Sequence, residues 1–283
     1  MSKAEVLRSL LKKKNLLVVP GVYDGLTSRI AGHCGAQAIY MTGFGTAAAW
    51  GYPDFGLLTM TEMLENVRRI SDAVDIPLIA DADTGYGNVI NVYRTVREYE
   101  RAGAAAIQFE DQTWPKRCGH MEGKQVISSE EMVGKIKAAV DARVSAETIL
   151  VVRTDAVKTH GFDEAILRGA MYAEAGADVL FIEAPANEEQ MRKIPGLFEK
   201  PCVMNMAVGI QGVEPKDLAE MGYAIVIYPL VTLIGAIEGA MRMCTALIRE
   251  GRQAESSGLT SSLEQLSQFL GLDKIKEMEG KYV

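Results

Sequence analysis

The run AAAIQF at residues 104–109 leads directly into EDQTWPKRCGHMEGK at residues 110–124. The first run is short and apolar, which is typical of a buried strand. The second packs three acids, an adjacent Lys-Arg pair, a thiol and an imidazole into one segment. A strand that ends this way delivers ionisable groups to one rim of a sheet, where parallel barrels place their chemistry. We interpret residues 110–124 as a catalytic loop.

Seven more short apolar runs rich in β-branched residues accompany this strand. They lie at 16–19, 38–41, 77–80, 149–152, 179–182, 202–204 and 224–227. Most lack the period-two alternation of a half-exposed strand, so we expect them to be buried on both faces of a parallel sheet. Segments of helical period, such as 61–73 and 162–175, lie between most of them. The alternation predicts an α/β fold, a closed (β/α)8 TIM barrel, with an open doubly wound sheet as the alternative.

Glycine marks the passage from helix to strand at four places, namely Gly35, Gly103, Gly176 and Gly222. Glycine just past a helix end adopts the left-handed conformation without a Cβ penalty. No GxGxxG motif follows the first strand, which weakens the dinucleotide-binding version of the open sheet.

Composition narrows the class of protein. The 283 residues suffice for one barrel, and the net charge of -7 disfavours a nucleic-acid partner, which surplus Lys and Arg would bind. Four irregularly spaced cysteines and a polar N-terminal segment predict reduced thiols in a cytoplasmic protein. The longest apolar region, 228–248, is interrupted by Glu238 and Arg242, so we interpret it as a packed helix and predict no membrane partner.

Two aspartates follow the third predicted strand, at Asp81 and Asp83. Residues two apart in extended backbone point the same way, so both carboxylates are predicted to face one cation. Hard oxygen ligands with few protein contacts suit Mg²⁺, and Asp54 and Glu110 are candidates to hold its waters. An Asp-x-Asp pair alone is equally compatible with an exposed loop, and the eight-strand context favours the metal.

Other polar groups follow the remaining strands. Thr42, Gly43 and Phe44 follow the second strand, which contains Tyr40, while Arg153, Glu183 and Asn205 end the fifth, sixth and seventh. Because the carboxyl ends of parallel strands meet at one rim, these groups are predicted to form one site.

The segment KRCGH, residues 116–120, is the more specific signal. Lys116 and Arg117 favour the thiolate of Cys118, and His120 can exchange protons with it across the flexible Gly119. An inert buried thiol is the main alternative, and half of a zinc site is a lesser one. The remaining cysteines lie in apolar or helical contexts typical of core thiols, at Cys34, Cys202 and Cys244.

Taken in order and spacing, these motifs resemble the isocitrate lyase and phosphoenolpyruvate mutase superfamily. The similarity runs over DADTGYG at 81–87, EDQ at 110–112, KRCGH at 116–120 and RTDA at 153–156, and KRCGH is characteristic of the carbon–carbon lyase branch. The resemblance implies a barrel domain over 1–250 and a C-terminal helical extension over 251–283. It also implies a C-terminal helix exchanged between subunits of a homodimer or homotetramer.

The resemblance further implies roles for the site residues. Asp81 and Asp83 would bind Mg²⁺, or Mn²⁺, with Asp54 and Glu110 on the metal-bound waters. Arg153 and the backbone at 42–44 would bind the substrate carboxylate, with Glu183, Asn205 and Gly119 lining the substrate site. In a retro-aldol cleavage of a 2-hydroxy dicarboxylate, Cys118 would protonate the departing enolate. Tyr40 or a metal-bound water would be the base, and Lys116, Arg117 and His120 would stabilise the negative charge.

One departure from the family bears on the substrate. Methylisocitrate and isocitrate lyases follow the seventh-strand Asn with Thr or Ser and Glu, whereas Met206-Ala207-Val208-Gly209 follows Asn205 here. An apolar wall would leave a third carboxylate desolvated. We therefore expect an alkylated substrate, such as 2,3-dimethylmalate giving pyruvate and propionate. The alternatives are 2-methylisocitrate cleavage, oxaloacetate cleavage or decarboxylation, phosphonopyruvate-type chemistry, and a barrel without catalytic activity.

Overall fold

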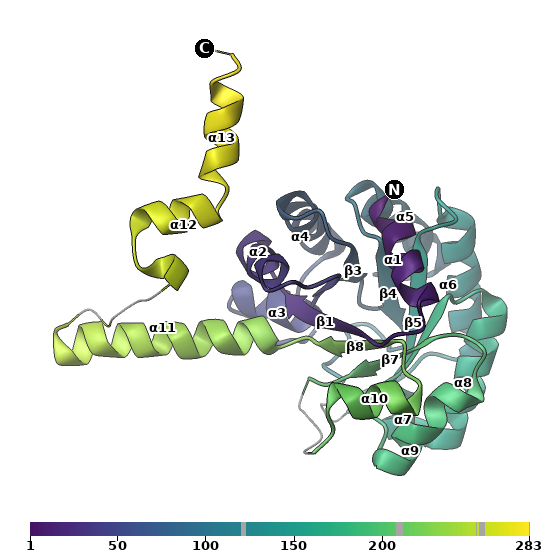
Figure 1. Ribbon diagram of the computed structural model, residues 1–283. Helices are drawn as coiled ribbons and strands as arrows, with labels where there is room; N and C mark the ends of the chain where they lie inside the picture. Colours follow the sequence, from purple (N-terminus) through teal and green to yellow (C-terminus); the bar gives the residue numbers. More distant parts are fainter. Residues whose placement is uncertain (120–122, 208–211, 253, 255–257, 283) are drawn as a thin grey trace. The chain divides into compact units, whose positions relative to one another are not determined.

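Eight parallel strands close into a barrel in the order of the chain, with β1 hydrogen-bonded to β8 (Figure 1). This computed structural model describes residues 1–119, 123–207, 212–252, 254 and 258–282. The strands are β1 (Leu17–Val22), β2 (Ile39–Met41), β3 (Leu78–Asp81), β4 (Ala106–Glu110), β5 (Ile149–Thr154), β6 (Val179–Ile182), β7 (Cys202–Asn205) and β8 (Ile225–Tyr228). The predicted (β/α)8 barrel is confirmed, and the open sheet is excluded because the two end strands pair.

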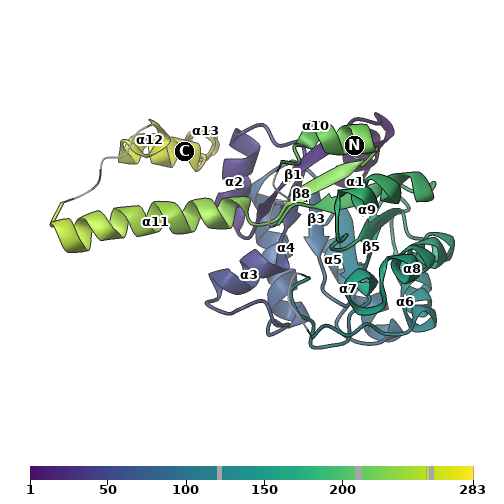
Figure 2. The ribbon, with the colours of Figure 1, turned by 90° about the horizontal axis from the view of Figure 1, so that it is seen from below.

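Helices surround the strands, as Figures 1 and 2 show. Those of the barrel are α1 (Lys3–Lys12), α2 (Gly25–His33), α3 (Gly43–Ala49), α4 (Met60–Ala73), α5 (Val89–Arg101), α6 (Ser129–Ala142), α7 (Ala156–His160), α8 (Phe162–Ala175), α9 (Glu188–Lys193), η1 (Ile194–Leu197) and α10 (Pro215–Met221). The turns at Gly176 and Gly222 adopt the predicted left-handed conformation, with φ of 117° and 94°.

Two apolar clusters explain why the strands lack alternation. One fills the barrel interior and includes Val19, Tyr40, Ile79 and Phe181. The other lies between the strands and the helices and includes Ile39, Leu78 and Ile107. Because both faces of the sheet are buried, apolar residues occupy odd and even positions alike.

Helix α1 covers the amino ends of the strands. Its Leu7 is fully buried in the same cluster as Leu17, and its Arg8 donates hydrogen bonds to the carbonyls of Glu147 and Thr148, which precede β5. Lys3 donates to the carbonyl of Ser71. The sequence patterns did not predict this helix. Because it covers the amino ends of the strands, the rim at their carboxyl ends remains open for the site.

The joint between β1 and β8 depends on a glycine. A Cβ added to Gly21 would lie 2.2 Å from the carbonyl oxygen of Pro229. Backbone atoms cannot yield as a flexible side chain can, so we expect Gly21→Ala to lower the free energy of unfolding by about 1–3 kcal/mol. Urea denaturation would measure this. Gly196→Ala is the control, because no atom lies within 4 Å of the added Cβ there, and equal effects of the two substitutions would contradict the expectation.

The chain divides into two compact units, Met1–Leu233 and Ile234–Val283. The division falls inside α11 (Val231–Glu250), earlier than the predicted boundary at residue 250. Beyond α11 the structure describes η2 (Gly258–Thr260), α12 (Leu263–Phe269) and α13 (Leu272–Glu279).

Helix α11 covers the apolar region that we interpreted as a packed helix, and what it packs against stays a prediction. Among the described residues it is the one helix whose length and composition would suffice to cross a membrane, and only 6% of its apolar window is buried. Large apolar side chains are exposed along it, including Ile237, Met241 and Ile248. Exchange of this helix between subunits stays a prediction.

Candidate active site

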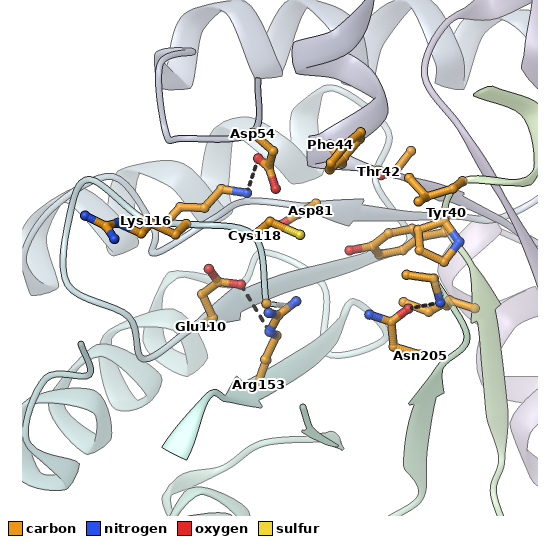
Figure 3. Close-up of a pocket in the computed structure, with 16 residues that line it drawn as sticks. Tyr40, Thr42, Phe44, Asp54, Asp81, Glu110, Lys116, Cys118, Arg153 and Asn205 are labelled. Atoms are coloured by element: carbon orange, nitrogen blue, oxygen red, sulfur yellow. Dashed lines mark hydrogen bonds and ion pairs between the residues drawn. The ribbon is translucent and has the colours of Figure 1, made fainter. Parts of the chain in front are cut away.

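A cavity of about 300 Å³ opens at the carboxyl ends of the barrel strands (Figure 3). It is lined by Tyr40, Thr42, Phe44, Asp54, Asp81, Glu110, Lys116, Arg117, Cys118, Gly119, Arg153, Asn205, Ala207, Ile227, Pro229 and Leu230. Twelve of these were predicted from sequence, and in Figure 3 the Cys118 side chain points into the space between Asp81, Tyr40 and Arg153. The predicted residues therefore converge on one cavity.

Three further predicted residues contact this lining. Gly43 donates its backbone N–H to Asp81 Oδ2 at 3.2 Å, Asp83 lies 3.0 Å from Lys116, and Glu183 lies 3.6 Å from Arg153. His120 lies outside the described residues. Its predicted role stays a prediction.

The two aspartates of the predicted metal site are brought together by a turn. Strand β3 ends at Asp81, and Asp83 has a φ of 46°, in the left-handed region. The extended-backbone reasoning was therefore wrong at Asp83, because the chain turns there, with Gly85 N–H bonded to the Ala82 carbonyl. The carboxylates still meet at one place, since a Cβ on Gly43 would lie 2.7 Å from Asp81 Oδ2 and 3.5 Å from Asp83 Oδ1.

Lys116 lies among these carboxylates. Its Nζ is 2.6 Å from Asp54 Oδ1 and 3.0 Å from Asp83 Oδ1, with all three side chains nearly buried. Burial raises the pKa of Asp83 to about 6, with Asp81 and Asp54 adding to the effect and the Lys116 ammonium opposing it. Burial alone would lower the pKa of Lys116, but these acids hold it well above its usual value. The site thus concentrates more negative charge than one ammonium neutralises.

The donor set fits a hard divalent cation. Asp81, Asp83, Asp54 and Glu110 offer only carboxylate oxygens, and all four are buried. No group of three or more His, Cys, Asp or Glu side chains poised to hold a metal occurs among the described residues. Magnesium takes few protein ligands and keeps several waters, so a pair of carboxylates meets its requirements.

Arg153 is the second cation of the cavity. Its guanidinium donates two hydrogen bonds to Asp155, at 2.8 and 2.9 Å, and lies 3.3 Å from Glu110. Burial would lower the pKa of Arg153, but Asp155, Glu110 and Glu183 raise it well above its ordinary value. Burial also raises the pKa of Glu110 well above its usual range, against the opposing effect of Arg153. The arginine is therefore a fixed positive charge in the cavity lining, and its role in binding a substrate carboxylate stays a prediction.

Tyr40 is held as a hydrogen-bond donor. Its hydroxyl donates to Gln108 Oε1 at 3.0 Å, and Gln108 Nε2 lies 3.4 Å from Asp81 Oδ1. Burial, followed by the negative charge of Asp81, raises the pKa of Tyr40 well above 10. These surroundings favour the neutral phenol, and the role of base stays a prediction.

Comparisons with known proteins agree with this geometry. The profile of the family described as phosphoenolpyruvate phosphomutase matches residues 7–248. The chain is 45% identical to 2,3-dimethylmalate lyase of Eubacterium barkeri, covering 100% of this chain and 99% of that protein. The chain belongs to the phosphoenolpyruvate mutase and isocitrate lyase superfamily. This confirms the predicted family.

Other members of the superfamily differ in their reactions. The chain is 41% identical to 2-methylisocitrate lyase of Aeropyrum pernix, over 88% of this chain and 81% of that protein. A crystal structure of a 2,3-dimethylmalate lyase matches with a TM-score of 0.94 and 36% identity, covering 100% and 96% of the two chains. An oxaloacetate acetylhydrolase complex matches with a TM-score of 0.94 and 35% identity, covering 99% and 97%. A phosphonopyruvate hydrolase bound to oxalate and Mg²⁺ matches with a TM-score of 0.91 and 30% identity, covering 100% and 99%.

Asn205 and Ala207 belong to the lining of this superfamily site. Asn205 donates to both carboxylate oxygens of Glu183 at 3.3 Å and accepts a hydrogen bond from Ala207 N–H. Ala207 lines the cavity, Met206 is buried in the core outside the barrel interior, and Val208 lies outside the described residues. Among the described residues of the predicted wall only Ala207 lines the cavity, and Ile227, Pro229 and Leu230 are further apolar residues of the lining.

The four thiols have different surroundings. Cys118 lines the cavity and is partly exposed, so it is not a buried thiol, and its reactivity stays a prediction. Cys202 is buried as predicted, and burial raises its pKa to about 12. Cys34 and Cys244 are exposed, so their prediction as core thiols was wrong. Cys34 follows the last residue of α2, and Cys244 lies on α11, where apolar sequence context does not ensure burial.

Two residues that sequence reasoning left without a role support the site. Asp155 receives both hydrogen bonds of Arg153, and Asp111 accepts hydrogen bonds from Asp155 N–H and from the Thr154 hydroxyl. Both carboxylates are fully buried. Asp111 directly follows the end of β4 and Asp155 the end of β5, and this position was the available signal.

Proposed function

We propose that this chain is a carbon–carbon lyase that cleaves a 2-hydroxy dicarboxylate to pyruvate and a second carboxylic acid. The substrate that fits best is 2,3-dimethylmalate, which would give pyruvate and propionate. The observation that carries this choice is the composition of the cavity lining, which combines charged groups with the apolar residues Ala207, Ile227, Pro229 and Leu230. The full-length similarity to a 2,3-dimethylmalate lyase supports the same choice.

The apolar wall selects against a third carboxylate. Ala207, Ile227, Pro229 and Leu230 line the cavity, and none of their side chains can donate a hydrogen bond. An ionised group placed against them would be desolvated without a partner, which is costly. Alkyl groups on the substrate would instead bury apolar surface there.

The charged groups suit an oxo-acid or hydroxy-acid carboxylate. Arg153 is buried, permanently charged and within the cavity, and Thr42 and Phe44, at the start of α3, also line the cavity. We propose that these groups bind the carboxylate next to the 2-hydroxyl. Glu183 orients Arg153 and Asn205 through the contacts described above.

Cleavage then requires movement of two protons. A base removes the proton of the 2-hydroxyl, its O–H electrons form the pyruvate carbonyl, and the C2–C3 bond breaks. The released electron pair resides on the enolate of the departing acid, and Cys118 donates the S–H proton to its carbon. Lys116 and Arg117 offset the negative charge that develops.

Asp81 and Asp83 are the residues that would hold Mg²⁺ or Mn²⁺, with Asp54 and Glu110 on its waters. When bound, the cation would supply Lewis-acid stabilisation of the oxygens that gain negative charge. Carboxylate-only donors and the surplus of buried acids support this assignment.

The substrate assignment predicts a preference that can be measured directly. We expect kcat/KM for 2,3-dimethylmalate to exceed that for 2-methylisocitrate by about a hundredfold or more, which corresponds to leaving one carboxylate poorly solvated. Pyruvate release followed with lactate dehydrogenase would measure both substrates on the same enzyme. A clear preference for 2-methylisocitrate would contradict the proposal.

Oxaloacetate and phosphonopyruvate belong in the same comparison. Oxaloacetate is the second candidate substrate, because the chain matches an oxaloacetate acetylhydrolase over nearly its whole length. Phosphonopyruvate is disfavoured because the segment KRCGH at 116–120 resembles the carbon–carbon lyase branch of the superfamily.

We further propose that the unit Ile234–Val283 packs on a neighbouring copy in a homodimer or homotetramer. The exposed apolar residues of α11 support this, because an aqueous monomer would leave them in water. A cytoplasmic location also stays a prediction.

A further inference from the structure

The peptide segment that carries Cys118 is held on its amino side by one glutamine. Gln112 accepts a hydrogen bond from Arg117 N–H at 3.0 Å and donates to the Arg117 carbonyl at 2.9 Å. Its amide also donates to Glu110 Oε1 at 2.9 Å, and its side chain is almost fully buried. The backbone just before the thiol is thus bound on both of its polar groups by a single side chain.

On the carboxyl side the same segment is held by a lysine. Lys124 donates to the Gly119 carbonyl at 2.6 Å and to Asp155 Oδ1 at 2.5 Å. Its side chain is 2% exposed and the Asp155 side chain is fully buried. A buried ammonium with carbonyl and carboxylate acceptors forms charge-assisted hydrogen bonds, which are the stronger kind.

Asp155 links this lysine to the substrate-binding arginine. Its two oxygens accept from Arg153, and Oδ1 also accepts from Lys124. Burial would raise the pKa of Asp155, but Arg153 and Lys124 lower it well below its usual range. The carboxylate is therefore a permanent acceptor that fixes both cations relative to each other.

Steric contact adds to this arrangement. A Cβ on Gly119 would lie 2.2 Å from Arg153 Nη2 and 2.7 Å from Glu183 Oε1. The backbone beside Cys118 therefore passes directly over the guanidinium. Only glycine permits that approach, so the position of the loop is set relative to Arg153.

We propose that Gln112 and Lys124 are positioning residues that fix the Cys118 thiol over the substrate site. Gln112 fixes Arg117 against Glu110, and Lys124 fixes Gly119 against the Asp155–Arg153 pair. The part of this inference that concerns turnover rests on the proposed function of Cys118 as proton donor. The placement of the thiol itself does not, and can be tested without substrate.

The test compares alkylation of all four cysteines by iodoacetamide, followed by mass spectrometry of their peptides, in the wild type, Lys124→Met and Gln112→Leu. We expect the rate at Cys118 to change by about tenfold in each variant, the factor for losing a hydrogen bond to a charged or buried group. The other thiols serve as references within each sample, because Cys34 is exposed and Cys202 is buried. Cys34 should react as in the wild type, and Cys202 should stay protected.

Lys3→Met is the matched control variant. Lys3 also donates to backbone carbonyls, those of Ser71 and Val74, but at the amino end of the barrel. Its removal should leave the Cys118 rate unchanged. A Cys118 rate within twofold of the wild type in Lys124→Met or Gln112→Leu, with Cys202 protected, would overturn the proposal for that residue.

If Lys124→Met unfolds the protein, alkylation of Cys202 will reveal it. Lys124→Arg is then the variant to test, because it keeps the positive charge and changes only the position of the hydrogen-bond donors. A smaller change at Cys118, of about threefold, is expected, and no change would count against the proposal. In those variants that remain folded, kcat for 2,3-dimethylmalate should fall while KM changes little, because the lost hydrogen bond affects proton transfer by Cys118. If the wild type shows no turnover but the alkylation rates change as expected, the proposed function fails and the positioning role stands.

Discussion

Cys118→Ser is expected to lower kcat for cleavage of 2,3-dimethylmalate by about a hundredfold to ten-thousandfold, the range typical of removing a general acid. Serine keeps the size of the side chain but holds its proton far more tightly than a thiol does. The cavity and its charges should be unaffected, so KM should change little. Steady-state measurement of pyruvate release gives both constants.

The exposed cysteines supply matched controls for this substitution. Cys34→Ser and Cys244→Ser alter thiols that lie outside the cavity lining, so both variants should retain wild-type turnover. Unchanged kcat in Cys118→Ser, across every 2-hydroxy diacid that the wild type accepts, would rule out the thiol as proton donor.

Removal of divalent cations is expected to abolish activity to below about one hundredth of the initial rate, and Mg²⁺ or Mn²⁺ should restore it. The carboxylates of Asp54, Asp81 and Glu110 line the cavity, and Asp83 contacts Lys116 beside them. Lys116 and Arg153 are already paired with buried acids, so we expect a divalent cation to be needed to stabilise the developing enolate. Dialysis against EDTA followed by titration with each metal measures the loss and the recovery.

The variant Asp83→Asn tests metal binding directly and independently of enzyme activity. The amide removes one negative charge at the predicted site, so calorimetry should show weaker Mg²⁺ binding by about tenfold or more, independent of any assay of turnover. Full activity after exhaustive chelation, or unchanged Mg²⁺ affinity in Asp83→Asn, would remove Asp83 from the metal site.

The barrel could be predicted because most strands are buried on both faces and therefore carry apolar runs without period-two alternation. The rim residues followed from strand order alone, since parallel strands all end at the same side. Tyr40, Asp81, Glu110 and Arg153 could be assigned to one cavity on that basis, and the cavity contains all four.

What could not be predicted depends on local turns and on contacts distant in sequence. The left-handed φ of Asp83 brings two carboxylates together in a way that residue spacing does not reveal. Pro229 and Leu230 directly follow β8 and line the cavity, which no periodicity indicates. Asp155 acts through Arg153 and Lys124, and its role follows only from seeing all three together.

The pairing of β1 with β8 joins Leu17 to Ile225, nearly the whole length of the barrel apart. Such distant contacts form late in folding because a long loop must close before they contribute. During synthesis, one edge of β1 stays unpaired until residues 225–228 have left the ribosome. An unpaired strand edge is prone to pair with other chains. Overproduction of this enzyme should therefore be limited by aggregation of unfinished chains, and chaperones that shield nascent strands should raise its yield.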